Sequence, residues 1–311
     1  MILTVGTTPT MQRTMTFDRL RLDHVNRSVV TDEYASGKGV NVARVAALLG
    51  ADVIATGFAG GARGKALLEG MTADGVRHDF VRVGPETRLC TTVIDRGKGT
   101  VTELVEESRA VEPADWDRLL RVVRKHLKVA KVCVLSGSLP PGGDEDFYRQ
   151  VAELAAAAGV RTIIDARGRP LLRAIGTAGL IVKLNREELA ATVGRAVGGD
   201  AALRRAMREV CPVGGQVIVT MGGDGAVAWD GQQSWALPAP KIKVANPIGS
   251  GDAFAAGLAT ALASGKSPKV SYALAAASGA GNAGHQRAGY VDAAMVDRLV
   301  RRSIPRRWGR K

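Results

Sequence analysis

One segment of the chain has the residue types needed to move a phosphoryl group. Gly249-Ser250-Gly251 comes directly before Asp252, and the Ala-rich run that follows is typical of a helix. A helix N-terminus has unpaired amides and a partial positive charge, and glycines let a phosphate reach them. Phosphoryl transfer also needs a carboxylate that accepts the proton of the attacking hydroxyl. Asp252 could simply cap the helix. A cap needs no preceding Gly-x-Gly, however, so the segment favours a catalytic base beside an anion hole.

A second segment places a cation and an amide close to the start of another helix. Gly37 and Gly39 flank Lys38, and Asn41 follows two residues later. The glycines would let the backbone and the ammonium group approach one ligand. The alternative is an ordinary polar loop in which Asn41 caps the helix.

Two further segments lie where a predicted strand ends. Asn185 and Glu188, in the run 183–188, are three residues apart and share one helix face. They either form a cap pair or hold hydrated Mg²⁺ on ATP phosphates, because Mg²⁺ keeps its waters and uses few carboxylates. Residues 220–226, with three glycines, form either a hairpin turn or one wall of a nucleotide site.

The elements that must position these residues alternate along the chain. Strand patterns cover residues 53–58, 132–135, 160–165, 180–183 and 216–221, and helical patterns cover 65–74, 144–158, 185–192, 201–210, 252–263 and 268–279. Strand and helix in turn predict βαβ units and a mostly parallel sheet.

Two segments depart from that alternation. Residues 7–31 and 88–107 alternate apolar with polar side chains, which predicts a half-exposed antiparallel sheet. Lys98, between Gly97 and Gly99, is expected in the turn between two of its strands. We expect this small sheet to project from the body as a lid.

Composition limits the class of protein. The 311 residues fit one large domain, 1–302, followed by a basic tail, 303–311, and the net charge is +13. Six cations in the last eleven residues favour a frayed, solvated tail over a nucleic-acid contact, so no nucleic-acid partner is expected. Cys90, Cys133 and Cys211 have no metal-binding spacing. Without a signal peptide or a membrane-length apolar run, a reduced cytoplasmic protein with no membrane partner is predicted.

Three other signatures fail. Residues 60–66 come near a Walker loop, but the spacing is one residue short and Ala66 replaces the magnesium-binding hydroxyl. Residues 279–284 match G-x-G-x-x-G, yet a helical pattern rather than a strand precedes them. The four histidines are isolated in the sequence, so no zinc site is expected.

Taken in order, these segments resemble the ribokinase-like sugar kinases of the phosphofructokinase B family. Gly37-Lys38-Gly39-x-Asn41 is similar to the N-terminal signature of that family, and Gly249-x-Gly251-Asp252 to its C-terminal signature. Residues 137–142 and the Lys-x-Asn-x-x-Glu run at 183–188 are similar to the branch that holds 1-phosphofructokinase and tagatose-6-phosphate kinase.

The resemblance implies a fold, a reaction and a set of site residues. It implies a three-layer αβα sandwich with a mostly parallel central sheet and a β-sheet lid, with dimers formed through the lids. It also implies an ATP-dependent kinase, with Mg²⁺, that phosphorylates a primary hydroxyl of a hexose phosphate. The implied residues are Asp252 as base with Gly249, Ser250 and Gly251 as anion hole; Gly37, Lys38, Gly39, Asn41 and Arg88 for the sugar phosphate; Lys183, Asn185, Thr220, Gly222, Gly225 and Asn282 for ATP; and Asn185 and Glu188 for the metal.

The sugar pocket departs from that branch. Gln12 stands where an aspartate binds sugar hydroxyls, and Cys90 and Val105 stand where asparagines are usual. Losing a charged acceptor weakens sugar binding by roughly 1–3 kcal/mol. A kinase for an unphosphorylated sugar or nucleoside, and a non-catalytic sensor of nucleotide or sugar, therefore stay open. The pair Lys38 and Arg88 favours a phosphorylated acceptor.

Overall fold

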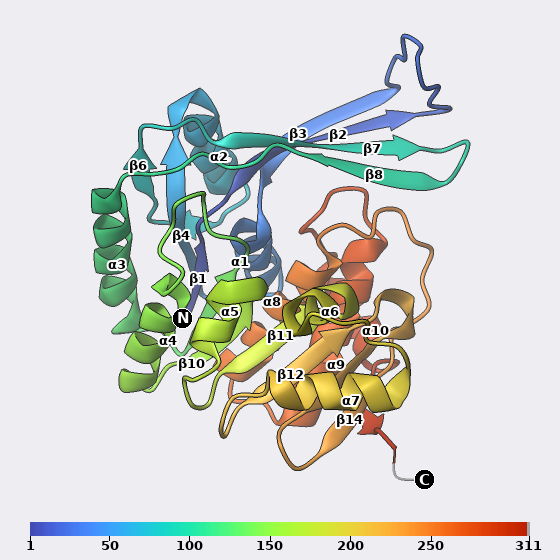
Figure 1. Cartoon of the computed structure of the whole chain (residues 1–311). Helices are drawn as coiled ribbons and strands as arrows, with labels where there is room; N and C mark the ends of the chain where they lie inside the picture. Colours follow the sequence, from blue (N-terminus) through green and yellow to red (C-terminus); the bar gives the residue numbers. More distant parts are fainter. Residues whose placement is uncertain (310–311) are drawn as a thin grey trace.

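The computed structural model describes residues 1–309 and has a large central sheet between two layers of helices (Figure 1). The strands of this sheet are β1 (Ile2–Gly6), β4 (Val53–Gly60), β5 (Arg77–His78), β6 (Val81–Val83), β9 (Val132–Ser136), β10 (Arg161–Asp165), β11 (Ile181–Asn185), β12 (Gln216–Thr220), β13 (Ala226–Trp229), β14 (Ser234–Leu237) and β15 (Arg306–Arg307). Their order is β15-β14-β13-β12-β11-β10-β9-β1-β4-β5, with β6 also paired to β4. The pairs from β12 to β5 are parallel, and those from β12 to β15 are antiparallel.

Each face of the sheet is covered by helices. One layer contains α1 (Lys38–Leu48), α2 (Gly61–Ala73), α8 (Ser250–Ala263), α9 (Pro268–Ala283) and α10 (Ala293–Val300). The other contains α3 (Pro113–Leu127), α4 (Phe147–Ala157), α5 (Gly168–Ala174), α6 (Arg186–Val193) and α7 (Gly199–Glu209). Successive strand residues serve opposite cores: Val134 packs on the first layer, whereas Cys133 and Leu135 pack on the second. The predicted three-layer αβα architecture is confirmed.

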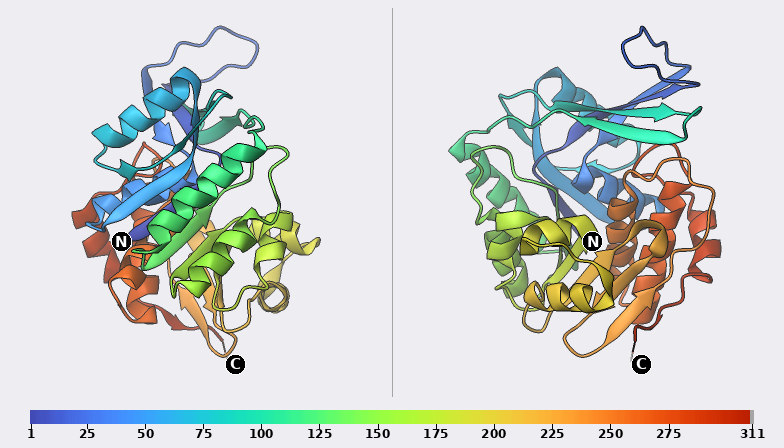
Figure 2. Two further views of the ribbon diagram at one scale, coloured as in Figure 1. Left: turned by 90° about the vertical axis from the view of Figure 1, so that its left-hand side faces the viewer. Right: turned by 45° about the vertical axis from the view of Figure 1, so that its right-hand side comes forward.

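The second sheet forms the expected lid, and both views of Figure 2 show it standing out from the body. Its order is β3 (Val30–Ser36), β2 (Thr10–Phe17), β7 (Arg88–Asp95) and β8 (Thr100–Val105). The turn at Lys98 is confirmed. Two predictions were wrong: the sheet extends to Ser36, and it is mixed rather than antiparallel. The two hairpins leave the body side by side, so β2 and β7 pair in parallel, with Thr10 opposite Arg88.

The C-terminal segment is ordered against the body as far as it is described. Arg306 and Arg307 form β15 on the edge strand β14, and the amide of Trp308 donates to the carbonyl of Ser234 at 3.0 Å. The guanidinium carbon of Arg204 lies 3.8 Å from the centre of the Trp308 ring. The prediction of a frayed tail was therefore wrong as far as residue 309. The segment is held against the body because flat guanidinium groups stack on tryptophan rings. Residues 310–311 lie outside the described residues.

None of the helices within residues 1–309 is long and apolar enough to cross a membrane.

Candidate active site

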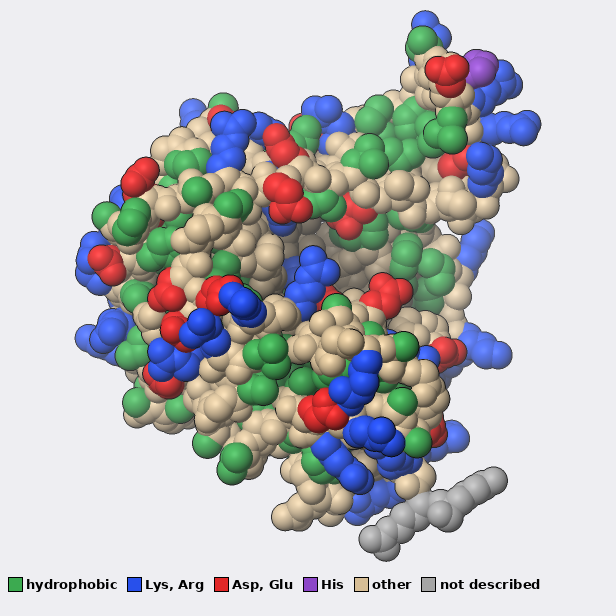
Figure 3. All heavy atoms as spheres, viewed as in Figure 1, with side chains coloured by type: hydrophobic (Ala, Val, Ile, Leu, Met, Phe, Trp, Pro, Cys, Tyr) green, Lys and Arg blue, Asp and Glu red, His purple; other side chains and the backbone are tan. Residues whose placement is uncertain are grey.

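A cavity of about 880 Å³ lies between the lid and the carboxyl ends of the parallel strands, where Figure 3 shows the surface hollowed. The helices α6 and α8 follow the sheet strands β11 and β14, and α1 follows the lid strand β3 where the chain returns to the body. All three helices therefore begin at this edge of the sheet. Open parallel sheets bind ligands in this place, since loops and helix N-termini converge there.

The cavity gathers most of the residues singled out in the sequence. All but two of the predicted site residues line it, namely Gln12, Gly37, Lys38, Asn41, Arg88, Lys183, Asn185, Glu188, Thr220, Gly222, Gly225, Gly249, Ser250, Gly251 and Asp252. The two exceptions are Gly39 and Asn282.

Asp252 lies in the first turn of α8 with only 6% of its surface exposed. Asn41 donates a hydrogen bond from Nδ2 to Asp252 Oδ2 at 2.8 Å. Burial raises the pKa of Asp252 to about 7, although the nearby Lys38 pulls it the other way. A carboxyl group that titrates near neutral pH can accept a proton from an alcohol and release it again.

The turn before Asp252 requires glycine. Gly249 has a φ of 80° in the left-handed region, and a Cβ there would lie 2.7 Å from the amide nitrogen of Gly289. A Cβ on Gly251 would lie 3.1 Å from Lys183 Nζ. In the first turn of α8 the amide of Ser250 donates to the carbonyl of Pro247 at 3.2 Å, which leaves the amides of Gly251 and Asp252 as those that a helix start does not pair. Two such amides beside a lysine can bind an anionic group.

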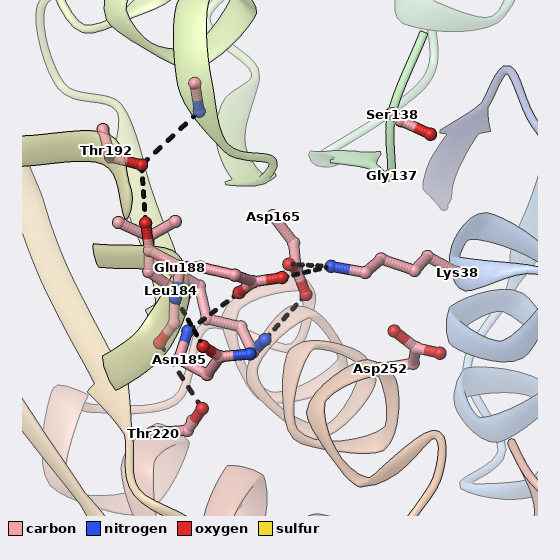
Figure 4. Close-up of polar contacts among 12 residues, drawn as sticks. Lys38, Gly137, Ser138, Asp165, Leu184, Asn185, Glu188, Thr192, Thr220 and Asp252 are labelled. Atoms are coloured by element: carbon pink, nitrogen blue, oxygen red, sulfur yellow. Dashed lines mark hydrogen bonds and ion pairs between the residues drawn. The ribbon is translucent and has the colours of Figure 1, made fainter. Parts of the chain in front are cut away.

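A buried charge cluster faces this helix tip (Figure 4). Asp165 ends β10 and is fully buried, with Oδ1 2.9 Å from Lys38 Nζ and Oδ2 2.7 Å from Lys183 Nζ. Lys38 Nζ also lies 3.1 Å from Glu188 Oε1. Burial opposes ionisation of Asp165, but the two lysines outweigh it and hold the pKa of Asp165 below its usual value.

Asp165 was missed in the sequence. The signal was present, because the predicted strand 160–165 ends on an acid at the same sheet edge as Lys183. The ammonium group of Lys38 is held by two carboxylates on the body side, and Arg88 is a second cation that lines the cavity, on the lid side.

Asn185 and Glu188 form the cap pair that the sequence left open. Asn185 Oδ1 accepts from the amide of Glu188 at 2.7 Å, and Glu188 Oε2 accepts from the amide of Asn185 at 2.9 Å. Within residues 1–309 no group of three or more His, Cys, Asp or Glu side chains is placed to hold a metal. Glu188 and Asp165 therefore fit a hydrated Mg²⁺ that arrives with a nucleotide, but not a dedicated metal cage.

The opposite wall of the cavity comes from the turn between β12 and β13. Thr220, Gly222 and Gly225 line it, and the strands on either side pair as a hairpin. The segment is therefore a hairpin turn that also lines the cavity.

The two predicted contacts that do not line the cavity position the backbone instead. Asn282 is fully buried behind the anion-hole loop and donates from Nδ2 to the carbonyl of Ile248 at 2.8 Å and to Ser250 Oγ at 3.2 Å. Its Oδ1 accepts from the amide of Gly289 at 2.7 Å.

Gly39 likewise packs on backbone. A Cβ on Gly39 would lie 2.9 Å from the Cα of Gly6 in β1, and one on Gly57 would lie 2.0 Å from the carbonyl oxygen of Gly6. Gly39 thus lets α1 start in direct contact with β1, whereas Gly57 lets β4 lie close to β1.

The lid side of the cavity carries polar groups. Arg88 donates from Nη2 to the carbonyl of Thr8 at 3.0 Å, and its buried Nε has no partner among the described residues. Gln12 Nε2 donates to Thr92 Oγ1 at 2.9 Å, which orients the Gln12 amide. Glu103, which the sequence reasoning missed, pairs with Thr92 in register, and burial raises its pKa despite the nearby Arg88.

Comparisons with known proteins relate the whole chain to carbohydrate kinases. The model of the pfkB family carbohydrate kinases matches residues 1–293. The chain is 33% identical over 307 residues to the tagatose-6-phosphate kinase of Staphylococcus epidermidis, covering 97% of this chain and 98% of that protein. Phosphofructokinase-2 of Escherichia coli, solved with potassium, superposes with a TM-score of 0.88 at 25% identity, covering 97% and 98% of the two chains. Ribokinase of Arabidopsis thaliana, solved with ribose and ATP, shares the fold with a TM-score of 0.76 at 22% identity, covering 96% and 98%. The chain belongs to the pfkB family of carbohydrate kinases.

Proposed function

We propose that this protein transfers the γ-phosphoryl group of ATP to a primary hydroxyl of a hexose phosphate. The observation that carries the proposal is the single cavity that joins a buried carboxylate, Asp252, and a glycine-lined helix tip on the body to Arg88 on the lid. The resemblance to tagatose-6-phosphate kinase suggests a ketohexose phosphate as acceptor.

In this mechanism Asp252 takes the proton of the acceptor hydroxyl. The hydroxyl oxygen forms its bond to the γ-phosphorus as the bond to the bridging oxygen breaks, and ADP leaves. The amides at the tip of α8 would stabilise charge on the transferring group, together with Lys38 and Lys183. Closure of the lid would exclude the water that could otherwise hydrolyse ATP.

Mg²⁺ bound to ATP would neutralise phosphate charge. Asp165 and Glu188 both line the cavity, and the lone pairs that the lysines leave free on their carboxylates would accept hydrogen bonds from the waters of the Mg²⁺ ion. Thr220 and the glycines of the hairpin turn would contact the nucleotide on the opposite wall.

Acceptor recognition would rest on the lid. Arg88 lines the cavity, and its guanidinium group suits a phosphate oxygen. The amide of Gln12 and the carboxylate of Glu103 would meet sugar hydroxyls in place of the aspartate usual in the branch. In addition, Leu22, Val25 and Leu104 leave apolar surface exposed on the lid, which supports a homodimer formed through this sheet.

A substrate panel tests the proposal. ADP release would be measured with tagatose 6-phosphate, fructose 6-phosphate, fructose 1-phosphate and the corresponding free sugars, each with Asp252→Asn as the blank. We expect kcat/KM for one phosphorylated ketohexose to exceed that for every free sugar by at least about tenfold, because Arg88 contributes a charge-assisted bond. Preference for a free sugar would favour the alternative that the sequence left open, a kinase for an unphosphorylated sugar or nucleoside. Ligand binding without ADP release from any sugar would refute catalysis.

A further inference from the structure

A second cluster of charges is buried behind Asn41, on the side away from the cavity. Arg44 in α1 is only 1% exposed, and its Nε lies 2.7 Å from Oδ2 of Asp74, which follows α2. Arg287 reaches the same oxygen at 2.8 Å. Burial lowers the pKa of Arg44, and the charge of Asp74 counteracts this effect. An arginine buried so deeply is costly for the fold unless every donor is used.

The Nη1 side of the Arg44 guanidinium group is directed at Asn41. Arg44 Nη1 donates to Asn41 Oδ1 at 3.3 Å, and Nη2 donates to the carbonyl of Ala35. Ser36 Oγ also donates to Asn41 Oδ1 at 3.0 Å. A guanidinium group has donors only. If the Asn41 amide were flipped, its NH₂ would face the guanidinium and its oxygen would face Asp252 Oδ2, so two contacts would become repulsive.

We propose that Arg44 is a positioning residue that fixes the Asn41 amide so that Nδ2 holds Oδ2 of Asp252. The proposal rests on the proposed function, because Asp252 is the base there. The chain of contacts is continuous, from Asp74 through Arg44 and Asn41 to Asp252, and every distance in it is between 2.7 and 3.3 Å.

The same cluster connects the lid to the anion-hole loop. Arg287 lies with its guanidinium carbon 4.6 Å from the ring centre of Tyr34 on β3. The next residue, Ala288, donates its amide to the Tyr34 hydroxyl at 3.1 Å, and Gly289 donates to Asn282. Asp74 thus ties together two arginines, of which one orients Asn41 and the other supports the loop behind the helix tip.

The consequence for the base is measurable. The hydrogen bond from Asn41 lowers the pKa of Asp252 against the rise that burial causes. Without Arg44 the Asn41 amide can rotate, and that hydrogen bond is lost for part of the time. The pKa of Asp252 should then rise, and the acid limb of the kcat profile should move to higher pH.

Two variants and one control test this. Arg44→Met removes the donor, and Arg44→Met with Asp74→Leu replaces the buried ion pair by an apolar pair, which protects folding. Arg77→Met, a surface arginine paired with Asp52, is the matched control. We expect both Arg44 variants to lose about five- to tenfold in kcat at pH 7, because the acid limb shifts up by about one pH unit, and KM for ATP should be unchanged.

A second readout separates this proposal from the proposed function. Carboxyl ¹³C NMR of aspartate-labelled protein follows the titration of Asp252 directly, with Asp252→Asn identifying its signal, whether or not any sugar is turned over. An upward shift of that titration in both Arg44 variants supports the positioning role. An unmoved titration in the double variant would overturn it, even if kcat fell.

Discussion

Replacing the proposed base should stabilise the folded protein while it removes activity. Asp252→Asn keeps the shape and the contact with Asn41 but takes away a charge that is 6% exposed. Burial raises the pKa of Asp252 from its ordinary 3.8 to about 7. At 1.36 kcal/mol for each pH unit, this difference of about three units corresponds to about 4 kcal/mol at pH 8.

The sign follows from proton binding. The folded protein holds this proton more tightly than the unfolded chain, so the contribution of Asp252 to stability is greatest below pH 3.8, falls between pH 3.8 and about 7, and stays at its lower level above. The Asp252→Asn variant has no carboxyl group at this position and therefore does not lose this stability as the pH rises. Its advantage over the parent should therefore be largest at pH 8 and shrink to about 1 kcal/mol near pH 4.5.

Thermal unfolding of the two proteins at pH 8 and pH 4.5 measures the effect. At about 2 °C for each kcal/mol in a chain of this size, the variant should melt several degrees higher at pH 8. Its kcat should fall by about 10² or more. Asp18→Asn, at a largely exposed side chain, is the control and should leave Tm unchanged. A variant that melts lower than the parent at pH 8 would refute the view that Asp252 is a destabilised buried carboxylate.

Three further outcomes are expected. In the parent, kcat/KM should fall about tenfold for each pH unit below about 7, because protonated Asp252 cannot accept a proton; a flat profile down to pH 5 would contradict this. Arg88→Met should raise KM for the hexose phosphate by about 10- to 100-fold and leave KM for ATP unchanged, as initial rates at varied substrate would show; equal effects on both would argue against a phosphate contact. Asn282→Ala should lower kcat by about tenfold or more with KM for the sugar unchanged, since it frees the loop that shapes the helix tip; undiminished turnover would mean that the loop holds its shape alone.

The sequence was informative wherever one local pattern carries both structure and chemistry. Gly249 to Asp252 could be placed at a helix start because glycine, acid and Ala-rich run are adjacent, and the structure places them there. The carboxyl ends of the strands could be predicted in the same way, since the predicted strands are apolar runs that lead into polar residues or glycine. Parallel pairing then brings those ends to one edge, which is why so many predicted residues share one cavity.

What could not be predicted depends on partners distant in the sequence. Asp165 became part of the site only through Lys38, 127 residues away, and Lys183 on the neighbouring strand. The docking of Trp308 depends on Arg204, 104 residues earlier. The parallel pairing of the two lid hairpins depends on where each leaves the body, and no local pattern records this.

The contact between α1 and the sheet has a consequence for how mutational surveys of this enzyme should be read. Gly6 and Gly39 contribute no functional group, yet each lies where one added carbon would collide with the backbone of the other. Scanning by alanine is designed to delete groups, so at these positions it does the opposite and inserts one. A loss of activity there would report displacement of Lys38 and Asn41, and it should not be taken as evidence that the glycine touches a substrate.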